Sequence, residues 1–382
     1  MNFNKNDKIL IAPDKFKGSL TAFEVCEALI QGIQRVHPSL DLVSLPLADG
    51  GEGTAEILSY HTHGHPINFP VHDPLMRPIE SGINISGDGK TAYIEMARAS
   101  GLALLAATER NGVYTTTFGT AELILHALPL KPEKIILCIG GSATNEGGTG
   151  MASALGYRFY DKREKLIQPV GKELINIHSI DSSRVNPLLS SIPFEVACDV
   201  DNPLTGPTGA SHVYGPQKGV SGKDLALLDE GLENLSRVIK KDLHKDIREI
   251  PGSGAAGGLG GGAVAFLNAR IVSGIETVMS TSRFRKHIAD ARLVISGEGK
   301  IDMQTLSGKV VKGVADECQT RGIPLVLVCG KNEIAPSRFG APLARVYSLL
   351  ERVNTEKESM QQARALLIEI GKEIARGIPF TS

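Results

Sequence analysis

Short apolar segments alternate with helix-like segments at both ends of the chain, and this alternation restricts the possible folds more than any other feature. Lys8–Ala12 is a short apolar strand, and Thr21 with Glu24 three residues later forms a capping box, a typical helix start. Leu40–Leu47 is predicted to be a second strand and Gly53–Tyr60 a second helix. The chain therefore opens with a β-α-β unit.

The carboxyl-terminal end repeats this pattern. Strands are predicted at Arg292–Ile295, Pro324–Val328 and Val346–Leu350, with helices from about Gly308 to Arg321 and from Glu356 to Arg376. Two strands or three would each make a poor core, whereas five together reach the usual size of a sheet. The two ends therefore predict one α/β domain that is discontinuous in sequence and comprises residues 1–67 and 289–382.

The middle of the chain, residues 68–288, has a different pattern. Arg77–Ser86 and Thr91–Met96 alternate apolar and polar residues on either side of a Gly-Asp-Gly turn, which predicts an antiparallel hairpin. A length of 382 residues also favours two domains, at about 100–200 residues each. We therefore expect an inserted α+β domain.

Charge and composition limit the partners. The formal net charge of -1 gives no general attraction to nucleic acid or to an anionic membrane. No segment reaches the roughly 18 apolar residues of a membrane span, and no signal-peptide core precedes the first strand. We expect a cytoplasmic protein with small-molecule partners. The five cysteines are scattered singly without a C-x-x-C pair, so we expect reduced core residues.

Charged, glycine-containing loops follow four of the predicted strands. They are Pro13–Ser19, Ala48–Thr54, Ser296–Asp302 and Gly330–Glu333. In an open parallel sheet such loops leave the carboxyl edge, where ligands bind. Glycine is also the default residue of turns, so each loop taken alone could be an ordinary turn without a ligand. Together they favour one binding site.

A further glycine-rich loop, residues 140–150, follows the apolar run Lys134–Ile139. Its glycines let backbone amides approach an anion closely, and a helix beginning near Gly148 would direct its positive end toward that anion. The loop therefore predicts a phosphate site.

Three other motifs could indicate different functions. Gly252–Gly257 matches G-x-G-x-x-G, with Glu276 about 20 residues later, but a polar, helix-like segment precedes it where a dinucleotide site requires a strand. Gly308-Lys309 lacks the upstream glycine and the following Ser or Thr of a Walker A loop. The three histidines of His61–His65 could bind zinc, although a solvated surface turn is favoured because no acidic or cysteine partner is near.

Acidic residues end the apolar segment Glu195–Cys198. Asp199, Asp201 and Asn202 follow it directly, and they could supply one carboxylate as a base and another as an oxygen ligand for Mg²⁺. A capped turn before Pro203 is the alternative reading.

Six segments together resemble the bacterial glycerate kinases that phosphorylate (R)-glycerate from ATP. They are APDKFKGSLTA, LADGGEGT, GGSATNEGGTGMASALG, CDVDNPLTGPTGA, GAAGGLGGG and SGEGKIDMQTLSGK, and they span nearly the whole chain. The resemblance implies a Rossmann-like parallel-sheet domain split around a second domain, with the active site in the interdomain cleft. The sequence departs from the family at His61–His65 and at Val71–Pro74, where a plainer Gly-Pro turn is expected.

The resemblance also implies roles for particular residues, with ATP as phosphoryl donor and Mg²⁺ as cofactor. Phosphoryl transfer depends mainly on positioning and on charge neutralisation. We expect Asp199 to be the base, Asp49 to hold the glycerate hydroxyls, and Lys15 to neutralise charge on phosphate or on the glycerate carboxylate. The expected phosphate- and nucleotide-binding residues are Gly140, Gly141, Ser142, Thr144, Asn145, Gly147, Gly148 and Lys300. The expected substrate-binding residues are Lys17, Ser19, Glu52 and Asn202, and the expected Mg²⁺ ligands are Asp302 and Glu298.

Several functions remain open on the sequence alone. The family comparison favours position 2 of glycerate over position 3 as the phosphate acceptor, and a kinase for another small hydroxy acid would share every feature. An NAD-dependent dehydrogenase and a non-catalytic nucleotide-binding module are weaker alternatives. The residues leave the enantiomer and the oligomeric state undetermined.

Overall fold

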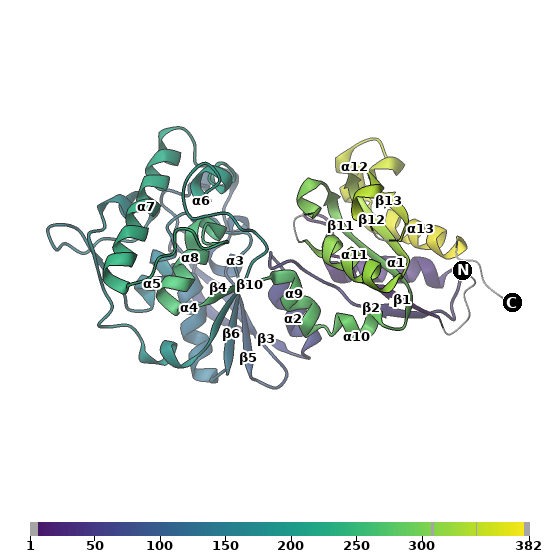
Figure 1. Ribbon diagram of the computed structural model, residues 1–382, viewed down its shortest axis with the longest axis horizontal. Helices are drawn as coiled ribbons and strands as arrows, with labels where there is room; N and C mark the ends of the chain where they lie inside the picture. Colours follow the sequence, from purple (N-terminus) through teal and green to yellow (C-terminus); the bar gives the residue numbers. More distant parts are fainter. Residues whose placement is uncertain (1–6, 307–308, 341, 378–382) are drawn as a thin grey trace. The chain divides into compact units, whose positions relative to one another are not determined.

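The computed structural model describes residues 7–306, 309–340 and 342–377. They form two compact units (Figure 1). Unit 1 comprises the described residues up to Asp49 and from Ile275 onward, and unit 2 comprises Gly50–Gly274. Unit 1 is therefore discontinuous in sequence, and unit 2 is inserted between its two parts.

Unit 1 contains a five-stranded sheet in the order β13-β12-β11-β1-β2, and all its neighbouring strands are parallel. Two strands come from the amino-terminal part and three from the carboxyl-terminal part, as the sequence predicted. The strands are β1 (Lys8–Ile11), β2 (Asp41–Ser44), β11 (Ala291–Ile301), β12 (Leu325–Asn332) and β13 (Leu343–Ser348).

Helices cover this sheet. Thr21 caps the first one as predicted, because Glu24 N donates to Thr21 Oγ1 and Thr21 N donates to Glu24 Oε2. Apolar residues of α1 and α13 share one buried core with β1, β11, β12 and β13, while α11 contacts β11 and β12 (Figure 1). The helices are α1 (Ala22–Gln34), α9 (Gly274–Thr281), α10 (Phe284–Ile288), α11 (Val310–Arg321), α12 (Glu356–Gln361) and α13 (Ala363–Arg376). The expected helix start at Gly308 and the Gly308-Lys309 pair involve a residue outside the described ones.

Unit 2 is built on a mixed six-stranded sheet in the order β10-β9-β6-β5-β4-β3. β10, β9, β6 and β5 are parallel, whereas β4 is antiparallel to both β5 and β3, which confirms the predicted hairpin. A separate pair, β7 and β8, is antiparallel. The strands are β3 (His65–His72), β4 (Pro78–Ile85), β5 (Thr91–Glu95), β6 (Lys134–Cys138), β7 (Arg158–Tyr160), β8 (Ser179–Asp181), β9 (Phe194–Ala197) and β10 (Arg270–Val272).

Two larger cores and a small cluster of Val113, Val220 and Leu228 stabilise unit 2. One lies between the sheet and residues of α4 and α8, and the other joins residues of α7 and α8 to Phe159 and Leu174. The helices are α2 (Thr54–His61), α3 (Ala97–Ser100), α4 (Phe118–Ala127), α5 (Thr149–Ala154), α6 (Ala210–Tyr214), α7 (Lys223–Leu243) and α8 (Ala255–Leu267). None of the described helices is long and apolar enough to cross a membrane. Among the described residues no disulfide forms, and Cys198 is the only cysteine that is not buried.

The boundaries between the units lie at 49/50 and 274/275, earlier in the sequence than the expected 67/68 and 288/289. The predicted helix Gly53–Tyr60 is α2, and it contacts β3, β4 and β5 of unit 2 instead of the parallel sheet of unit 1. His65, expected in a surface turn, begins β3 and pairs with Ile85. The first boundary falls earlier because α2 packs on the hairpin that follows it.

Two of the segments that were predicted to be loops belong to strands. β11 continues through Ile301 and β12 through Asn332, with Lys300 opposite Lys331, so the segments expected as loops after the third and fourth strands extend the sheet. The glycines that suggested turns instead allow close packing: a Cβ on Gly297 would lie 1.9 Å from the Val328 carbonyl oxygen. Glycine inside a strand commonly marks such a close backbone approach.

Gly297→Ala is expected to lower the free energy of unfolding by about 1–3 kcal/mol, because the added methyl group must displace backbone. Thermal denaturation measures this effect. Gly377→Ala is the matched control, since a Cβ there meets its nearest atoms at an ordinary 3.5 Å. Equal melting temperatures for the two variants would contradict the explanation.

Candidate active site

The parallel strands of unit 2 bring four chain segments to one sheet edge. β5, β6, β9 and β10 are neighbours, so the residues that follow them leave the same side. These residues include Glu95 at the end of β5, the start of the glycine-rich loop after β6, Asp199 after β9 and Ser273 after β10. This edge is the candidate site of unit 2.

Hydrogen bonds fix the orientation of Asp199 at this edge. Its Oδ1 accepts from Ser273 Oγ at 2.7 Å and from Gly274 N at 2.9 Å. Both donors belong to the segment after β10, which the sequence reading did not connect with Asp199. The two bonds limit the rotation of the carboxyl group.

Backbone contacts bring the two glycine-rich loops of unit 2 together. A Cβ on Gly140 would lie 2.5 Å from Gly51 Cα, and a Cβ on Gly50 would lie 2.8 Å from the Ala197 carbonyl oxygen. Gly53 N donates to Glu95 Oε1 at 2.9 Å. Motifs far apart in sequence therefore meet here, and the exposed Glu52 lies beside Gly140.

Only the first part of the loop at 140–150 is accessible. Gly141 is exposed and Gly140 half-buried, whereas Ser142 and the residues from Thr144 through Gly148 are buried. Within the turn Gly140–Ser142, a phosphate could directly reach the backbone of Gly140 and Gly141. Thr144, Asn145, Gly147 and Gly148, expected in the phosphate site, lie inside unit 2.

The expected role of the helix end is wrong. α5 does begin at Thr149 after Gly148, but the buried Glu146 carboxylate already accepts hydrogen bonds from Thr149 Oγ1 at 2.6 Å and from Gly150 N at 2.7 Å. An internal carboxyl group therefore already accepts hydrogen bonds at the start of this helix.

The second glycine-rich run also has a structural explanation. The segment before Gly252–Gly257 is not a strand. The sequence indicated the same, because that segment is polar. Gly257 has φ +69°, and a Cβ there would lie 2.0 Å from the Thr144 carbonyl oxygen. These glycines let α8 pack against the buried part of the first loop.

Asn202, expected to bind substrate, is held by internal hydrogen bonds. Its Nδ2 donates to Thr208 O at 2.8 Å, and its Oδ1 accepts from Tyr214 Oη at 2.6 Å. Both polar atoms of the amide therefore organise the loop after β9.

Three carboxylates gather in unit 1. Asp14 follows β1, Asp49 follows β2 and Glu298 lies in β11, and these strands are neighbours with β1 in the middle. Asp14 N donates to Gly297 O at 2.8 Å, which extends the pairing of β1 with β11. The strand order reverses between β1 and β11, the place where open α/β sheets bind ligands. The sequence reading missed Asp14, although it stands between Pro13 and Lys15 in a quoted motif.

Burial keeps two of these carboxyls protonated at higher pH than usual. It raises the pKa of Asp14 to about 8, and the charge of Asp49 adds to this shift while Lys15 opposes it. Burial also raises the pKa of Glu298 to about 7, opposed by a hydrogen bond from Thr305 and by Lys309. Asp14 and Glu298 therefore titrate near neutral pH.

The expected Mg²⁺ ligands differ in their surroundings. Glu298 Oε1 is buried and accepts no hydrogen bond from the described residues, so it suits a cation. Asp302 lies 3.3 Å from Lys300, which also pairs with Glu333 at 2.9 Å. Within the described part of the chain, no group of three or more His, Cys, Asp or Glu side chains is arranged to hold a metal ion. Mg²⁺ commonly uses one or two carboxylates with phosphate oxygens and water, and Glu298 fits that pattern.

The other expected residues of unit 1 lie in the segment after β1. Lys15 is half-buried, and its backbone N donates to Asp14 Oδ1 at 2.7 Å. Lys17 is exposed. Ser19 Oγ donates to the Met360 carbonyl at 2.8 Å, so this hydroxyl connects the loop to α12.

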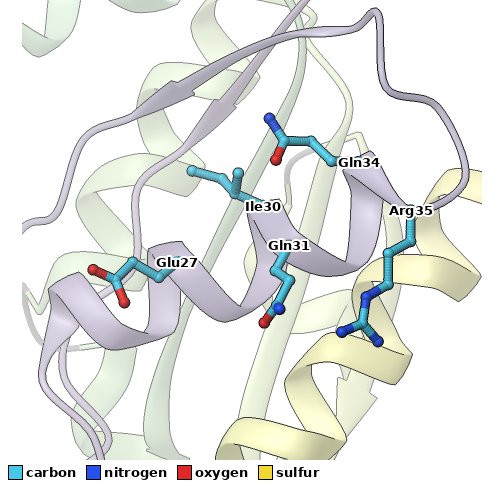
Figure 2. Close-up of a pocket in the computed structure, with 5 residues that line it drawn as sticks. All are labelled: Glu27, Ile30, Gln31, Gln34 and Arg35. Carbon is cyan, nitrogen blue, oxygen red and sulfur yellow. The ribbon is translucent and has the colours of Figure 1, made fainter.

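Two surface pockets lie away from all the expected residues. A shallow pocket of about 390 Å³ is lined by side chains of α1, including Glu27 and Ile30, and by Arg35, which follows this helix (Figure 2). A larger one, of about 760 Å³, is lined in unit 2 by residues between Asp161 and His178 and by Asn234. Neither combines a candidate base with a phosphate-binding turn.

Comparisons with known proteins show the family of this chain. The model of the glycerate kinase family matches residues 9–379. The chain is 46% identical to a glycerate kinase of Bacillus subtilis, over 97% of each chain, and 43% identical to the glycerate 2-kinase of Escherichia coli, over 96% of this chain and 97% of that one. The crystal structure of a Salmonella typhimurium LT2 protein assigned as glycerate kinase 2 has a TM-score of 0.83 and 41% identity, over 97% of this chain and 98% of that one. The chain therefore belongs to the glycerate kinase family.

Proposed function

We propose that this protein transfers the γ-phosphoryl group of ATP to the 2-hydroxyl of (R)-glycerate, giving 2-phosphoglycerate and ADP. The observation that carries the proposal is the fixed Asp199 carboxylate, which leaves the same sheet edge of unit 2 as the accessible turn Gly140–Ser142. A base for a hydroxyl and backbone amides for a phosphate are the groups that such a transfer needs. The name of the Escherichia coli relative supports position 2.

In unit 2, Asp199 would accept the hydroxyl proton while the new oxygen–phosphorus bond forms and the bond to ADP breaks. The backbone of Gly140–Ser142 would bind phosphate oxygens, and the exposed Glu52 would bind the substrate. Because the transition state is loose, the protein contributes mainly by holding these groups in place.

In unit 1, Lys15, Lys17 and Lys300 would neutralise phosphate or carboxylate charge. Asp49 would accept hydrogen bonds from the glycerate hydroxyls. Mg²⁺ would be held by Glu298 and Asp302 together with phosphate oxygens, and it would neutralise charge on the transferred group.

A coupled assay of ADP release tests the reaction. With MgATP, (R)-glycerate is expected to give a kcat/KM at least about 100-fold above (S)-glycerate, lactate and glycolate, because a site with hydrogen-bonding groups rejects analogues that leave them unpaired. ADP release with another hydroxy acid but not with glycerate would assign a different substrate. Tight NAD binding without ADP release would favour the dehydrogenase alternative.

A further inference from the structure

A lysine is completely buried beneath the glycine-rich loop of unit 2. Lys218 ends a short 3₁₀ helix, Pro216–Lys218, and only 1% of its surface is exposed. Its Nζ donates a hydrogen bond to the Thr144 carbonyl oxygen at 2.6 Å. Lysine is almost never fully buried without a compensating partner, so this position requires an explanation.

The buried Glu146 carboxyl lies close enough to affect the pKa of this lysine. It lies two residues after Thr144, is itself fully buried, and accepts hydrogen bonds from Thr117 Oγ1, Thr149 Oγ1 and Gly150 N, each at 2.6–2.7 Å. Burial lowers the pKa of Lys218 to about 7, and the charge of Glu146 opposes this shift. Burial raises the pKa of Glu146 as well, opposed by the hydrogen bonds that it accepts, so burial favours the uncharged form of both side chains.

The Lys218 hydrogen bond acts on the Thr144 carbonyl, and the structure gives that carbonyl no second donor among the described residues. Thr144 Oγ1 and Asn145 Oδ1 are buried without a hydrogen-bond partner among the described residues. Other bonds hold the neighbouring positions. They include Thr115 Oγ1 to Ala143 O at 2.8 Å, Asn145 Nδ2 to Ser211 Oγ at 3.0 Å and Gly147 N to Gly257 O at 3.0 Å. At Thr144 itself, the bond from Lys218 is the one that fixes the carbonyl.

This buried segment continues directly into the accessible turn. Ala143 N donates to Ser100 O at 2.9 Å, and Leu102 N donates to Gly141 O at 2.8 Å. Only Ala143 separates Thr144 from Ser142, so a shift of the Thr144 carbonyl would be transmitted to the Gly140–Ser142 amides.

We propose that Lys218 is a positioning residue that sets the geometry of the Gly140–Ser142 turn for binding a phosphate group of ATP. This inference rests on the proposed function. Lys218 does not touch the substrate and acts only through the Thr144 carbonyl. A charge-assisted hydrogen bond in a dry interior is among the stronger single contacts available for such a task.

The test uses the full chain and two variants. Lys218→Met removes the donor, while Lys218→Met with Glu146→Gln also removes the charge that the single change leaves uncompensated, so at least one variant is expected to fold. The exposed Lys162, which lies in the same unit, provides the control Lys162→Met. Kinetics are measured against ATP and glycerate separately.

We expect the double variant to raise KM for ATP about tenfold or more, with KM for glycerate unchanged relative to Lys162→Met, because only the phosphate-binding turn is disturbed. A role limited to stability would lower the melting temperature and leave both KM values of the folded enzyme unchanged. That result, or an equal rise in both KM values, would overturn the proposal.

Hydrogen exchange without nucleotide provides a second measurement that is independent of activity. The amides of Gly141–Glu146 are expected to exchange faster in the double variant than in Lys162→Met. Unchanged exchange overturns the positioning role, and faster exchange with unchanged KM for ATP overturns its link to phosphate binding. A wild-type enzyme inactive on glycerate would refute the proposed function instead, while the exchange measurement would still test the positioning role.

Discussion

Asp199→Asn is expected to lower kcat by about 10²- to 10⁴-fold, the usual contribution of a general base. Asparagine retains the acceptor for Ser273 Oγ and Gly274 N, so the loop after β9 should keep its conformation. The loss would therefore reflect proton transfer and not misfolding. Steady-state kinetics at saturating MgATP and glycerate measure it.

Asp201→Asn is the matched control, because Asp201 lies two residues later on the same loop and is exposed. We expect its kcat to stay within about threefold of wild type, as is usual for a surface position away from the chemistry. A kcat for Asp199→Asn as high as that of the control would remove Asp199 from the role of base.

Asp14→Asn is expected to stabilise the protein more at pH 8 than at pH 5, by a difference of about 2–4 kcal/mol. Burial raises the pKa of Asp14 from 3.8 to about 8. Between these values the unfolded chain loses the Asp14 proton while the folded protein keeps it, so the carboxyl lowers stability progressively as pH rises toward 8. Asparagine has no proton to lose, and its side-chain oxygen can still accept from Lys15 N.

Urea denaturation at pH 5 and pH 8 measures this difference. Asp41→Asn is the control, because Asp41 is an exposed residue of β2 in the same unit. An equal effect of Asp14→Asn on the free energy of unfolding at pH 8 and at pH 5 would show that the pKa of Asp14 is not raised in the folded protein.

The sheet of unit 1 could be predicted because its signals are local. Short apolar runs such as Lys8–Ile11 and the capping box at Thr21 depend on neighbouring residues only. The full lengths of β11 and β12 could not be predicted, because Gly297 and Gly330 are typical of turns in isolation. Their strand conformation depends on pairing between segments about 30 residues apart.

The division between the units also depends on tertiary contacts. The pattern of Thr54–His61 predicts a helix, but nothing in the segment tells which sheet its apolar face meets. Only packing on β4 and β5 places it in unit 2.

The residues of the candidate site also differ in whether the local sequence could reveal them. Asp199 could be found because it follows an apolar strand, whereas its donors Ser273 and Gly274 lie 74 and 75 positions away. Asp14 could have been found by the same strand-end rule. Lys218 has no local signal, because it becomes unusual only when the fold buries it beside Thr144, 74 positions away.

The most direct test of the central claim is a ³¹P NMR spectrum of the products formed from MgATP and (R)-glycerate. The account predicts a 2-phosphoglycerate signal matched by an equal amount of ADP. A 3-phosphoglycerate signal would contradict the proposed position of transfer. The absence of any phosphorylated glycerate would contradict the proposed reaction itself.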